Sequence, residues 1–327
     1  MHTATAPRYT LLADIGGTNT RVALAQGSTL VPASVARFPN KGRAALEEIL
    51  TEYMVAERVS NLAGVCVAVA GPVSVDGQDA RMTNLDWTIR ASALQATTGA
   101  AHVSILNDLQ AQGHALSGLA PEALRMVLPG APAPKGAAQL VVGIGTGFNA
   151  APVHHAPQGY VVVPASECGH ITLPLRSELH IEIKRYFERK HRFASVEHAC
   201  AGRGLERIYA FVTGQEDATV DGKEILSLMQ SEDRDALKAA EIFTTLLGGV
   251  LGDLALTHLP FGGIYLIGGA ARAIEPWLER FNFQQAFKDK GSFSDYMERF
   301  SIHVVEDDYA ALAGCANYLA AHKLGLL

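Results

Sequence analysis

Two glycine-rich segments contain the residue types that can bind phosphate. The first comprises Asp14, Ile15, Gly16, Gly17, Thr18 and Asn19, and the second comprises Gly145, Thr146 and Gly147. Each lies between two apolar segments, so a strand, a turn and a second strand are expected. Glycine lets backbone N–H groups and a threonine hydroxyl come close to phosphate oxygens. One such turn is more typical of a plain hairpin, but two of them favour phosphate binding.

Neither turn matches the better-known nucleotide motifs. The pattern G-x-x-x-x-G-K-[ST] of a P-loop is absent, and a strand follows each turn where a dinucleotide-binding G-x-G-x-x-G would open a helix. Asp14 stands at the start of the first turn, where a carboxylate can serve the Mg²⁺ of a triphosphate, directly or through water. The alternative is an Asx-turn that stabilises the hairpin.

Polar and glycine residues also follow two other buried strands. Asn107 and Asp108 end the apolar run Val103–Leu106, where α/β folds place ligands. A carboxylate there can orient a hydroxyl and accept its proton, although the pair can also cap the helix expected from Leu109. Gly268 and Gly269 follow the strand 264–267. They provide either a flat backbone surface under an adenine ring or a tight strand-to-helix turn.

The order of the expected elements indicates two α/β lobes of related plan. A strand, a glycine turn and a second strand occur near residue 15 and again near residue 145, and further strands and helices follow each. Long helical patterns are expected at 178–190, 195–213, 233–257 and 309–322. A chain of 327 residues exceeds one compact domain, so a cleft between two lobes is the expected ligand site.

Bulk composition excludes several classes of function. The net charge of −6 and the pI of about 6.1 argue against nucleic acid as a partner. The basic run 184–192 suits the solvated face of an amphipathic helix. The four cysteines form no C-x-x-C pair. Met1–Thr10 lacks a signal pattern, and no unbroken apolar run approaches the ~20 residues that span a bilayer. A cytoplasmic protein without a membrane partner is therefore expected.

The motifs together resemble a known family. The matching segments are LLADIGGTNTRVAL, VAVAGPV, MTNLDW, ILNDLQA, VVGIGTG, SECGHITLP, SVEHACAGRGLERIY, GGIYLIGGAAR and FNFQQAFKDKGSFSDY. In order and spacing they are similar to the actin-like (ribonuclease H-like) sugar kinases, and more narrowly to the bacterial glucokinases that lack the zinc motif. The resemblance runs nearly from end to end, and its specificity comes from the whole set.

The resemblance implies a two-lobed α/β sugar kinase fold with a cleft between the lobes. The small lobe is expected at 1–108, completed by the C-terminal helix 306–327, and the large lobe at 109–305. The implied reaction is phosphoryl transfer from ATP to the 6-hydroxyl of glucose, with Mg²⁺ as the metal and no zinc. A homodimer is the expected assembly.

Site residues are carried over position by position. The resemblance makes Asp108 the catalytic base and gives sugar binding to Asn107, Asp108, Glu167, His170 and Glu197. It gives nucleotide binding to the two glycine turns and to Gly268 and Gly269. Two departures stand out: Cys168 replaces the usual glycine of its loop, and Phe148-Asn149-Ala150 replaces the commoner Leu-Gly-Val. A cysteine is strained at Cys168 if that position needs a positive φ.

Three other functions remain open from the sequence. A kinase for another hexose differs only in hydroxyl-scale geometry. A sugar or nucleotide sensor without turnover would not need Asp108. An actin-like or chaperone-like ATPase shares the phosphate turns, but has no use for Asn107-Asp108 together with the Glu167–His170 loop.

Overall fold

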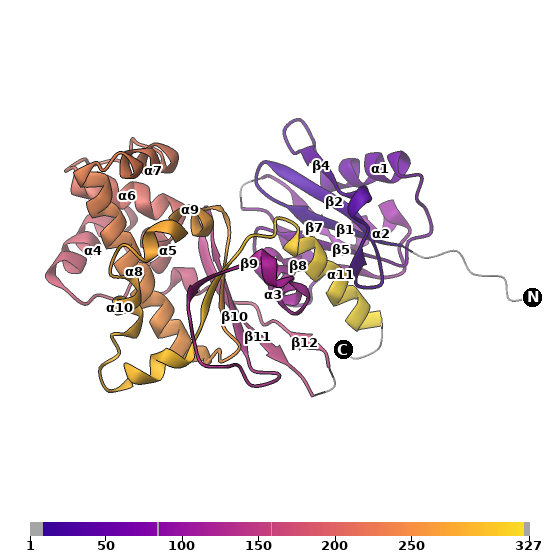
Figure 1. Ribbon diagram of the computed structural model, residues 1–327. Helices are drawn as coiled ribbons and strands as arrows, with labels where there is room; N and C mark the ends of the chain where they lie inside the picture. The colour runs from indigo at the N-terminus through magenta and orange to yellow at the C-terminus, as the bar shows by residue number, and fades with distance from the viewer. Residues whose placement is uncertain (1–8, 84, 158, 324–327) are drawn as a thin grey trace, which may run out of the picture. The chain divides into compact units, whose positions relative to one another are not determined.

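A computed structural model describes residues 9–323 except 84 and 158 (Figure 1). The chain divides into two compact units. Among the described residues, the first comprises those in 9–119, 156–165 and 307–323, and the second comprises 120–155 and 166–306. This division places the segments 109–119 and 156–165 in the first unit and residue 306 in the second, whereas the sequence placed the boundaries at 108 and 305.

The first unit is built on a mixed sheet. Its strands follow the order β3-β2-β1-β5-β8, and β4 also pairs with β2. Their bounds are β1 (Thr10–Ile15), β2 (Asn19–Gln26), β3 (Thr29–Leu30), β4 (Ala36–Pro39), β5 (Gly64–Val69) and β8 (Val103–Asn107). A separate hairpin joins β6 (Asp79–Arg81) to β7 (Thr88–Arg90). Strands β1, β5 and β8 are mutually parallel, so their carboxyl ends lie at the same end of the sheet.

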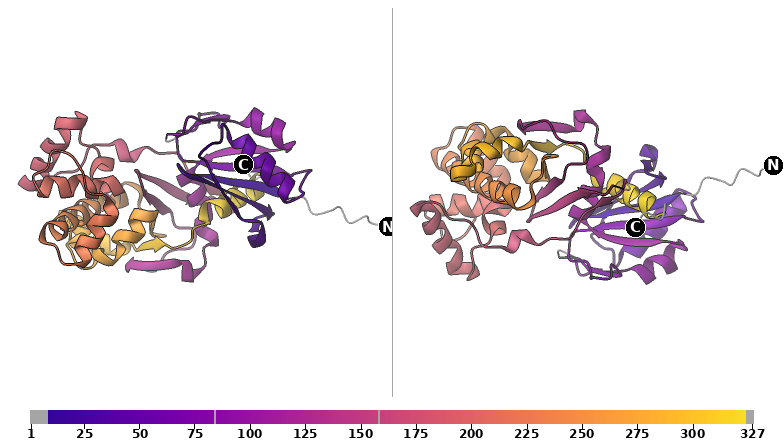
Figure 2. Two further views of the ribbon diagram at one scale, coloured as in Figure 1. Left: turned by 90° about the horizontal axis from the view of Figure 1, so that it is seen from above. Right: turned by 90° about the horizontal axis from the view of Figure 1, so that it is seen from below.

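Alternate residues of these strands pack into cores on opposite faces of the sheet, as the two-residue period of a strand dictates. One core contains residues of α1 (Leu46–Ala56) and α2 (Ala91–Thr98). The other contains residues of α3 (Asp108–Ala115) and α11 (Ala310–Lys323). Figure 1 shows α11, in yellow, beside α3 and the strands, and both views in Figure 2 agree.

The contact between α3 and α11 explains why the first unit extends beyond residue 108. A Cβ at Gly314 would lie 1.7 Å from the Ala111 carbonyl oxygen, so the two backbones touch there. The Asn317 side chain donates to the His114 carbonyl at 2.9 Å, and the His114 and Tyr318 rings meet edge to face. The segment 156–165, which contains β12 (Val161–Val162), is fastened by the Gln110 amide, which donates to the Val163 carbonyl at 2.9 Å.

The second unit has its own mixed sheet, in which strands run in the order β11-β10-β13-β14-β9. The bounds are β9 (Leu124–Leu128), β10 (Gln139–Ile144), β11 (Phe148–His155), β13 (Ile264–Ile267) and β14 (Ile302–Val305). Strands β10, β13 and β14 are parallel, and β11 and β9 are antiparallel to their neighbours. The hairpin β10–β11 thus has the same relation to β13 as β1–β2 has to β5.

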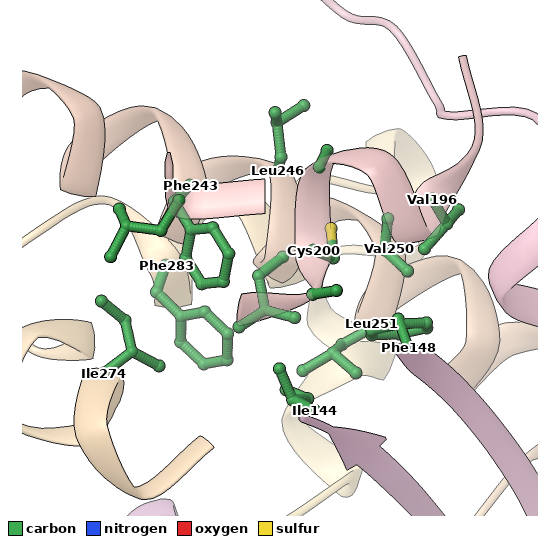
Figure 3. Packing of buried hydrophobic residues seen from close by; sticks show 14 of the residues in the cluster. Ile144, Phe148, Val196, Cys200, Phe243, Leu246, Val250, Leu251, Ile274 and Phe283 are labelled. Carbon is green, nitrogen blue, oxygen red and sulfur yellow. The ribbon is translucent and has the colours of Figure 1, made fainter. Parts of the chain in front are cut away.

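Helices surround the core of the second unit. They are α4 (Glu178–His191), α5 (Val196–Cys200), α6 (Gly202–Val212), α7 (Gly222–Gln230), α8 (Arg234–His258), α9 (Gly269–Leu278) and α10 (Phe283–Lys288). Phe243 and Leu251 of α8 pack with Phe283 and with Ile144 of the sheet (Figure 3). By length and composition α8 could cross a membrane, but 78% of its most apolar window is buried, as in the core helix of a globular unit.

One predicted helix is broken in the structure. The pattern at 195–213 forms two helices, α5 and α6, because Ala201 between them has extended backbone (φ −84°, ψ 170°). The Gly202 N–H donates to the Gly145 carbonyl at 2.8 Å rather than continuing α5. The break therefore fastens α6 to the second glycine turn.

Candidate active site

Strand register aligns the predicted site residues of the first unit along one sheet edge. Ile15 pairs with Val69, and Val69 pairs with Asn107. The first glycine turn and Asn107-Asp108 therefore emerge from the same end of the sheet. The Asn107 side chain also donates to the Gly71 carbonyl at 3.1 Å, which ties the loop after β5 to the end of β8.

The first glycine turn is held by a residue that sequence reasoning missed. Asn40 is buried (3% exposed) directly after β4. Its amide donates to the Gly16 carbonyl at 2.8 Å, and its carbonyl accepts from the Thr20 hydroxyl at 2.8 Å. Its backbone N–H donates to the Thr18 carbonyl at 2.9 Å. Nothing in the local sequence distinguishes Asn40 from an ordinary turn asparagine, since all three partners come from another part of the chain.

Asp14 lies one residue before Ile15, the last paired residue ahead of this turn, and faces Arg21 across the hairpin. The Arg21 guanidinium donates to Asp14 Oδ2 at 3.1 Å. Burial raises the pKa of the Asp14 carboxyl above its ordinary 3.8, and the attraction of Arg21 opposes that rise. No group of three metal-binding side chains occurs within the described residues. A single carboxylate still fits Mg²⁺, which proteins hold through one or two carboxylates together with substrate phosphates.

Asn107 and Asp108 have the capping role that was the alternative to catalysis. The Asn107 side chain accepts from the Leu109 N–H at 3.0 Å, and the Gln110 side chain completes a capping box by accepting from the Asn107 N–H at 3.2 Å. Asp108 Oδ1 also accepts from the Leu109 N–H, at 2.8 Å. Capping fixes the direction of both side chains at the sheet edge, and a carboxylate has enough lone pairs to accept further hydrogen bonds.

The second glycine turn is braced by Glu197. Within the turn, the Gly145 N–H donates to the Gly147 carbonyl at 3.0 Å. Glu197 Oε2 accepts from the Phe148 N–H at 3.1 Å. A Cβ at Gly147 would lie 2.6 Å from that same oxygen. Gly147 is therefore required for the close approach of Glu197, whereas a Cβ at Gly145 would meet no protein atom within 4 Å.

The loop with Glu167 and His170 is shaped by Asn149, one of the two departures from the family pattern. Its carbonyl accepts from the Cys168 N–H at 3.1 Å, and its amide donates to the Ser166 carbonyl. Cys168 opens the 3-10 turn η4 (Cys168–His170) and is not among the described non-glycine residues with positive φ. The strain considered for this cysteine is therefore not present.

Backbone pairing places His170 beside the helix of Glu197. Segment 171–173 lies antiparallel to 194–196: the Val196 N–H donates to the Ile171 carbonyl at 3.1 Å, and the Leu173 N–H donates to the Ala194 carbonyl at 3.0 Å. A Cβ at Gly169 would be 3.6 Å from the Glu197 Cβ. Glu167 and His170 are themselves exposed, and so are free to face a ligand.

A neutral histidine supports this helix. Burial, with His191 and Arg207 nearby, lowers the pKa of His198 to about 4. Its Nδ1 accepts from the Ser195 N–H at 3.1 Å and completes the cap of α5. The ring at residue 198 is therefore uncharged at neutral pH, next to the Glu197 carboxylate.

Gly268 and Gly269 lie beside the second glycine turn. Gly268 has a φ of +112°, and a Cβ there would lie 2.4 Å from the Ile144 carbonyl oxygen. A pocket of about 520 Å³ opens from Gly269. Its lining residues are Gly202, Leu205, Glu206, Asp221, Gly222, Lys223, Leu226, Phe243, Gly269, Ala270, Ala273 and Ile274. This size and mostly apolar lining suit a planar organic group.

Most of this lining was missed by sequence reasoning. It comes from α6, α7, α8 and α9, so no local pattern marks it. Glu206 is an example: its Oε1 accepts from the Gly222 N–H at 3.0 Å and closes one wall of the pocket. The only local signal is the small pair Ala201-Gly202, which allows α6 to begin against the second turn.

The two sheets, each containing a hairpin with a glycine turn, are those of the two-lobed sugar kinases. The crystal structure of a glucokinase from an Antarctic psychrotroph aligns with a TM-score of 0.82 and 28% identity, covering 95% of this chain and 98% of that one. A glucokinase from Balamuthia mandrillaris, solved in complex with glucose, aligns with a TM-score of 0.79 and 20% identity, covering 98% and 95%.

The sequence matches are narrower. The family model described as Glucokinase matches residues 11–322. A glucokinase from Rhizobium etli is 32% identical over 320 residues, covering 97% of this chain and 93% of that protein. The chain therefore belongs to the glucokinase family. The fold class, the family, the enzyme class and the ATP-dependent phosphorylation of glucose that the sequence predicted are confirmed.

Proposed function

We propose that this protein transfers the γ-phosphoryl group of ATP to the 6-hydroxyl of glucose, with Asp108 as the base that accepts the hydroxyl proton. The observation that carries this proposal is the register from Ile15 through Val69 to Asn107, which brings a phosphate-binding turn and a fixed carboxylate to one sheet edge. Phosphoryl transfer needs positioning and charge neutralisation more than covalent help, and a carboxylate oriented by a helix cap supplies positioning.

The remaining residues divide between sugar and nucleotide. We assign Asn107, Glu167, His170 and Glu197 to the sugar hydroxyls, since each hydroxyl both donates and accepts. A wrong epimer would leave such groups unpaired, at about 1–3 kcal/mol each. The two glycine turns are assigned to the phosphates. The pocket at Gly269 is assigned to the adenine ring, because its apolar lining leads away from the second turn.

Mg²⁺ belongs to the proposal as a partner of Asp14. When bound with ATP, the ion neutralises phosphate charge during transfer. The contribution of the chain is a carboxylate held by Arg21 at the base of the first turn. A homodimer and a cytoplasmic location are proposed as well. The four cysteines are all free, as expected where thiols stay reduced.

The decisive experiment compares ADP release by wild type and Asp108→Asn with Mg·ATP and a panel of hexoses. Asparagine keeps the shape and one oxygen to accept from Leu109, but it cannot take a proton. We expect glucose to stimulate release in the wild type, and kcat in the variant to fall by roughly 10²–10⁴-fold. Glucose binding, measured by calorimetry, should change little.

Asp217→Asn is the matched control, because Asp217 is an exposed acid paired with Lys190 on the surface of the second unit. It should behave as wild type. Near-normal turnover by Asp108→Asn would refute the assigned base. If another hexose stimulates release more strongly than glucose, the alternative sugar kinase holds. If no sugar stimulates it, a sensor or a plain ATPase replaces the kinase, and the sugar-free rate separates these two.

A further inference from the structure

Three glycines in the middle of α8 differ in whether neighbouring atoms leave room for a side chain. A Cβ at Gly248 would lie 2.4 Å from the Phe283 carbonyl oxygen, and a Cβ at Gly252 would lie 2.5 Å from the Phe287 carbonyl oxygen. Both glycines therefore allow α10 to pack closely on α8 (Figure 1). Gly249 is also buried, but a Cβ there would meet nothing within 4 Å. Glycine within a helix is unfavourable relative to alanine, and packing does not explain it here.

The space in front of Gly249 is a pocket of about 380 Å³ between α4, α8 and α10. This volume lies within the range of small-molecule sites. Leu246 and Gly249 of α8 form buried parts of the lining, and Pro174 and Ala286 add further apolar surface. Because residue 249 has no side chain, the space beside this apolar lining stays empty.

His180 gives this pocket a hydrogen-bond donor. The side chain is buried (8% exposed) and lines the pocket. Its Nδ1 accepts from the Arg176 N–H at 3.3 Å, so a neutral ring carries its proton on Nε2. Burial and the nearby Arg176 charge lower the pKa of His180, which keeps the ring neutral at physiological pH. The ring that lines the pocket therefore offers a neutral N–H donor rather than a positive charge.

The remaining polar groups favour an uncharged ligand. The two charged residues of the lining, Arg176 and Asp289, form an ion pair with each other at 2.8 Å. Asn282 and Gln285 bring amide groups that both donate and accept. The Asn282 side chain makes no capping bond to α10. Neither an anion nor a cation finds an unpaired opposite charge in this lining.

We propose that this pocket is a second ligand site, which binds a small uncharged molecule that has an apolar face and a carbonyl or hydroxyl oxygen. The oxygen accepts from His180 Nε2, the apolar face packs against Leu246 and Ala286, and the amides of Asn282 and Gln285 pair with a further polar group. None of these residues lines the pocket at Gly269 or belongs to the candidate active site, so the site is additional to that of the proposed kinase reaction.

Three nearly isosteric probes test both the site and the charge preference: benzamide, benzoate and benzamidine, which are neutral, anionic and cationic at pH 7. Binding to the full chain is measured by ligand-observed saturation-transfer NMR, with dissociation constants from titration. We expect saturable binding of benzamide, at least tenfold tighter than that of the other two. Gly249→Leu, which puts a side chain into the pocket, should abolish it.

Gly269→Leu is the matched control, since it puts the same side chain into the other pocket, where a Cβ would also meet nothing within 4 Å. It should leave benzamide binding unchanged. If Gly249→Leu does not fold, Gly249→Ala replaces it, and one added methyl group should still weaken binding severalfold. His180→Phe keeps the bulk but removes the donor, and should weaken benzamide at least fivefold.

Four results would overturn the proposal. They are no saturable benzamide binding, benzoate or benzamidine binding as tightly as benzamide, binding that survives a folded Gly249 variant, and binding indifferent to His180→Phe. ATP turnover does not enter the readout, so the proposal stands or fails independently of the proposed kinase activity.

Discussion

The two glycine hairpins share one backbone plan and differ in what surrounds them. In each, Ile15 or Ile144 is the last residue before the turn, and the next strand of the sheet is parallel to the first strand of the hairpin. In each, the N–H of the first glycine bonds to a carbonyl at the end of the turn at 3.0 Å. The first turn spans four residues between Ile15 and Thr20, and the second spans three between Ile144 and Phe148.

The position before the isoleucine shows the chemical difference. In the first hairpin Asp14 faces Arg21, whereas in the second Gly143 faces Asn149. The first hairpin thus has a carboxylate, which we propose serves a metal, and the second uses its asparagine to hold the loop of Glu167 and His170. The same backbone therefore serves charge handling in one unit and loop positioning in the other.

The residues that hold the two turns, Asn40 and Glu197, also differ in charge and in their remaining hydrogen-bonding capacity. Asn40 is an uncharged, buried residue whose side-chain nitrogen and oxygen both bond to the hairpin of the first turn. Glu197 uses one carboxylate oxygen on the Phe148 N–H and retains acceptor capacity for a ligand. We therefore expect damage to the second brace to affect sugar and turn together, and damage to the first to affect the nucleotide alone.

The largest effect is expected from Gly147→Ala. The new Cβ would lie 2.6 Å from Glu197 Oε2, so the carboxylate must swing away and lose its bond to Phe148. The fold should survive, because the clashing atom ends a flexible side chain. Misplacing a substrate-binding group by about 1 Å can lower activity on the order of 100-fold, and we expect a loss of that size in kcat/KM for glucose.

Gly145→Ala tests whether the loss in Gly147→Ala comes from displacing Glu197 or from any substitution in the second turn. Its Cβ would meet no protein atom within 4 Å, so thermal stability should not change, while a methyl group facing the phosphates should raise the KM for ATP severalfold. If Gly147→Ala retains wild-type kcat/KM for glucose, Glu197 is a structural brace only and does not bind the sugar.

A smaller effect is expected from Asn40→Ala in the first unit. The change removes the donor to Gly16 and the acceptor for Thr20, and lost buried hydrogen bonds cost about 1–3 kcal/mol of folding stability. A loosened turn should raise the KM for ATP by roughly tenfold, equivalent to about 1.4 kcal/mol, and leave the KM for glucose unchanged. Steady-state kinetics with each substrate varied in turn checks the split. An equal rise in both constants would contradict the separate roles of the two turns.

The braces also show where sequence reasoning reached its limit. Gly16, Gly145 and Asp108 could be predicted as site residues because each follows an apolar strand within a few residues, and α/β folds place ligands at the carboxyl ends of strands. Asn40 lies more than twenty residues from the Gly16 carbonyl that it binds, and the lining around Glu206 and Phe243 comes from four helices. Contacts of that range depend on packing, which no local pattern records. The division of the chain depends on contacts of the same range, because α3 packs on the distant α11 within the first unit.

The smallest effect concerns the charge that only the first hairpin has. Burial raises the pKa of Asp14 above 3.8, so the folded protein holds this proton more tightly than the unfolded chain. The stability that the group contributes is complete below 3.8 and is lost as the pH rises through the folded pKa. Asp14→Asn cannot titrate, so the unfolding midpoint of wild type minus that of the variant should be highest at acidic pH and fall as the pH rises towards neutrality. Because Arg21 offsets part of the burial penalty, we expect this difference in midpoint to change by roughly 2 °C or less.

Thermal unfolding of both proteins from pH 4 to pH 8 measures the difference in midpoint. A difference that instead grows with pH would mean that the attraction of Arg21 outweighs burial at Asp14.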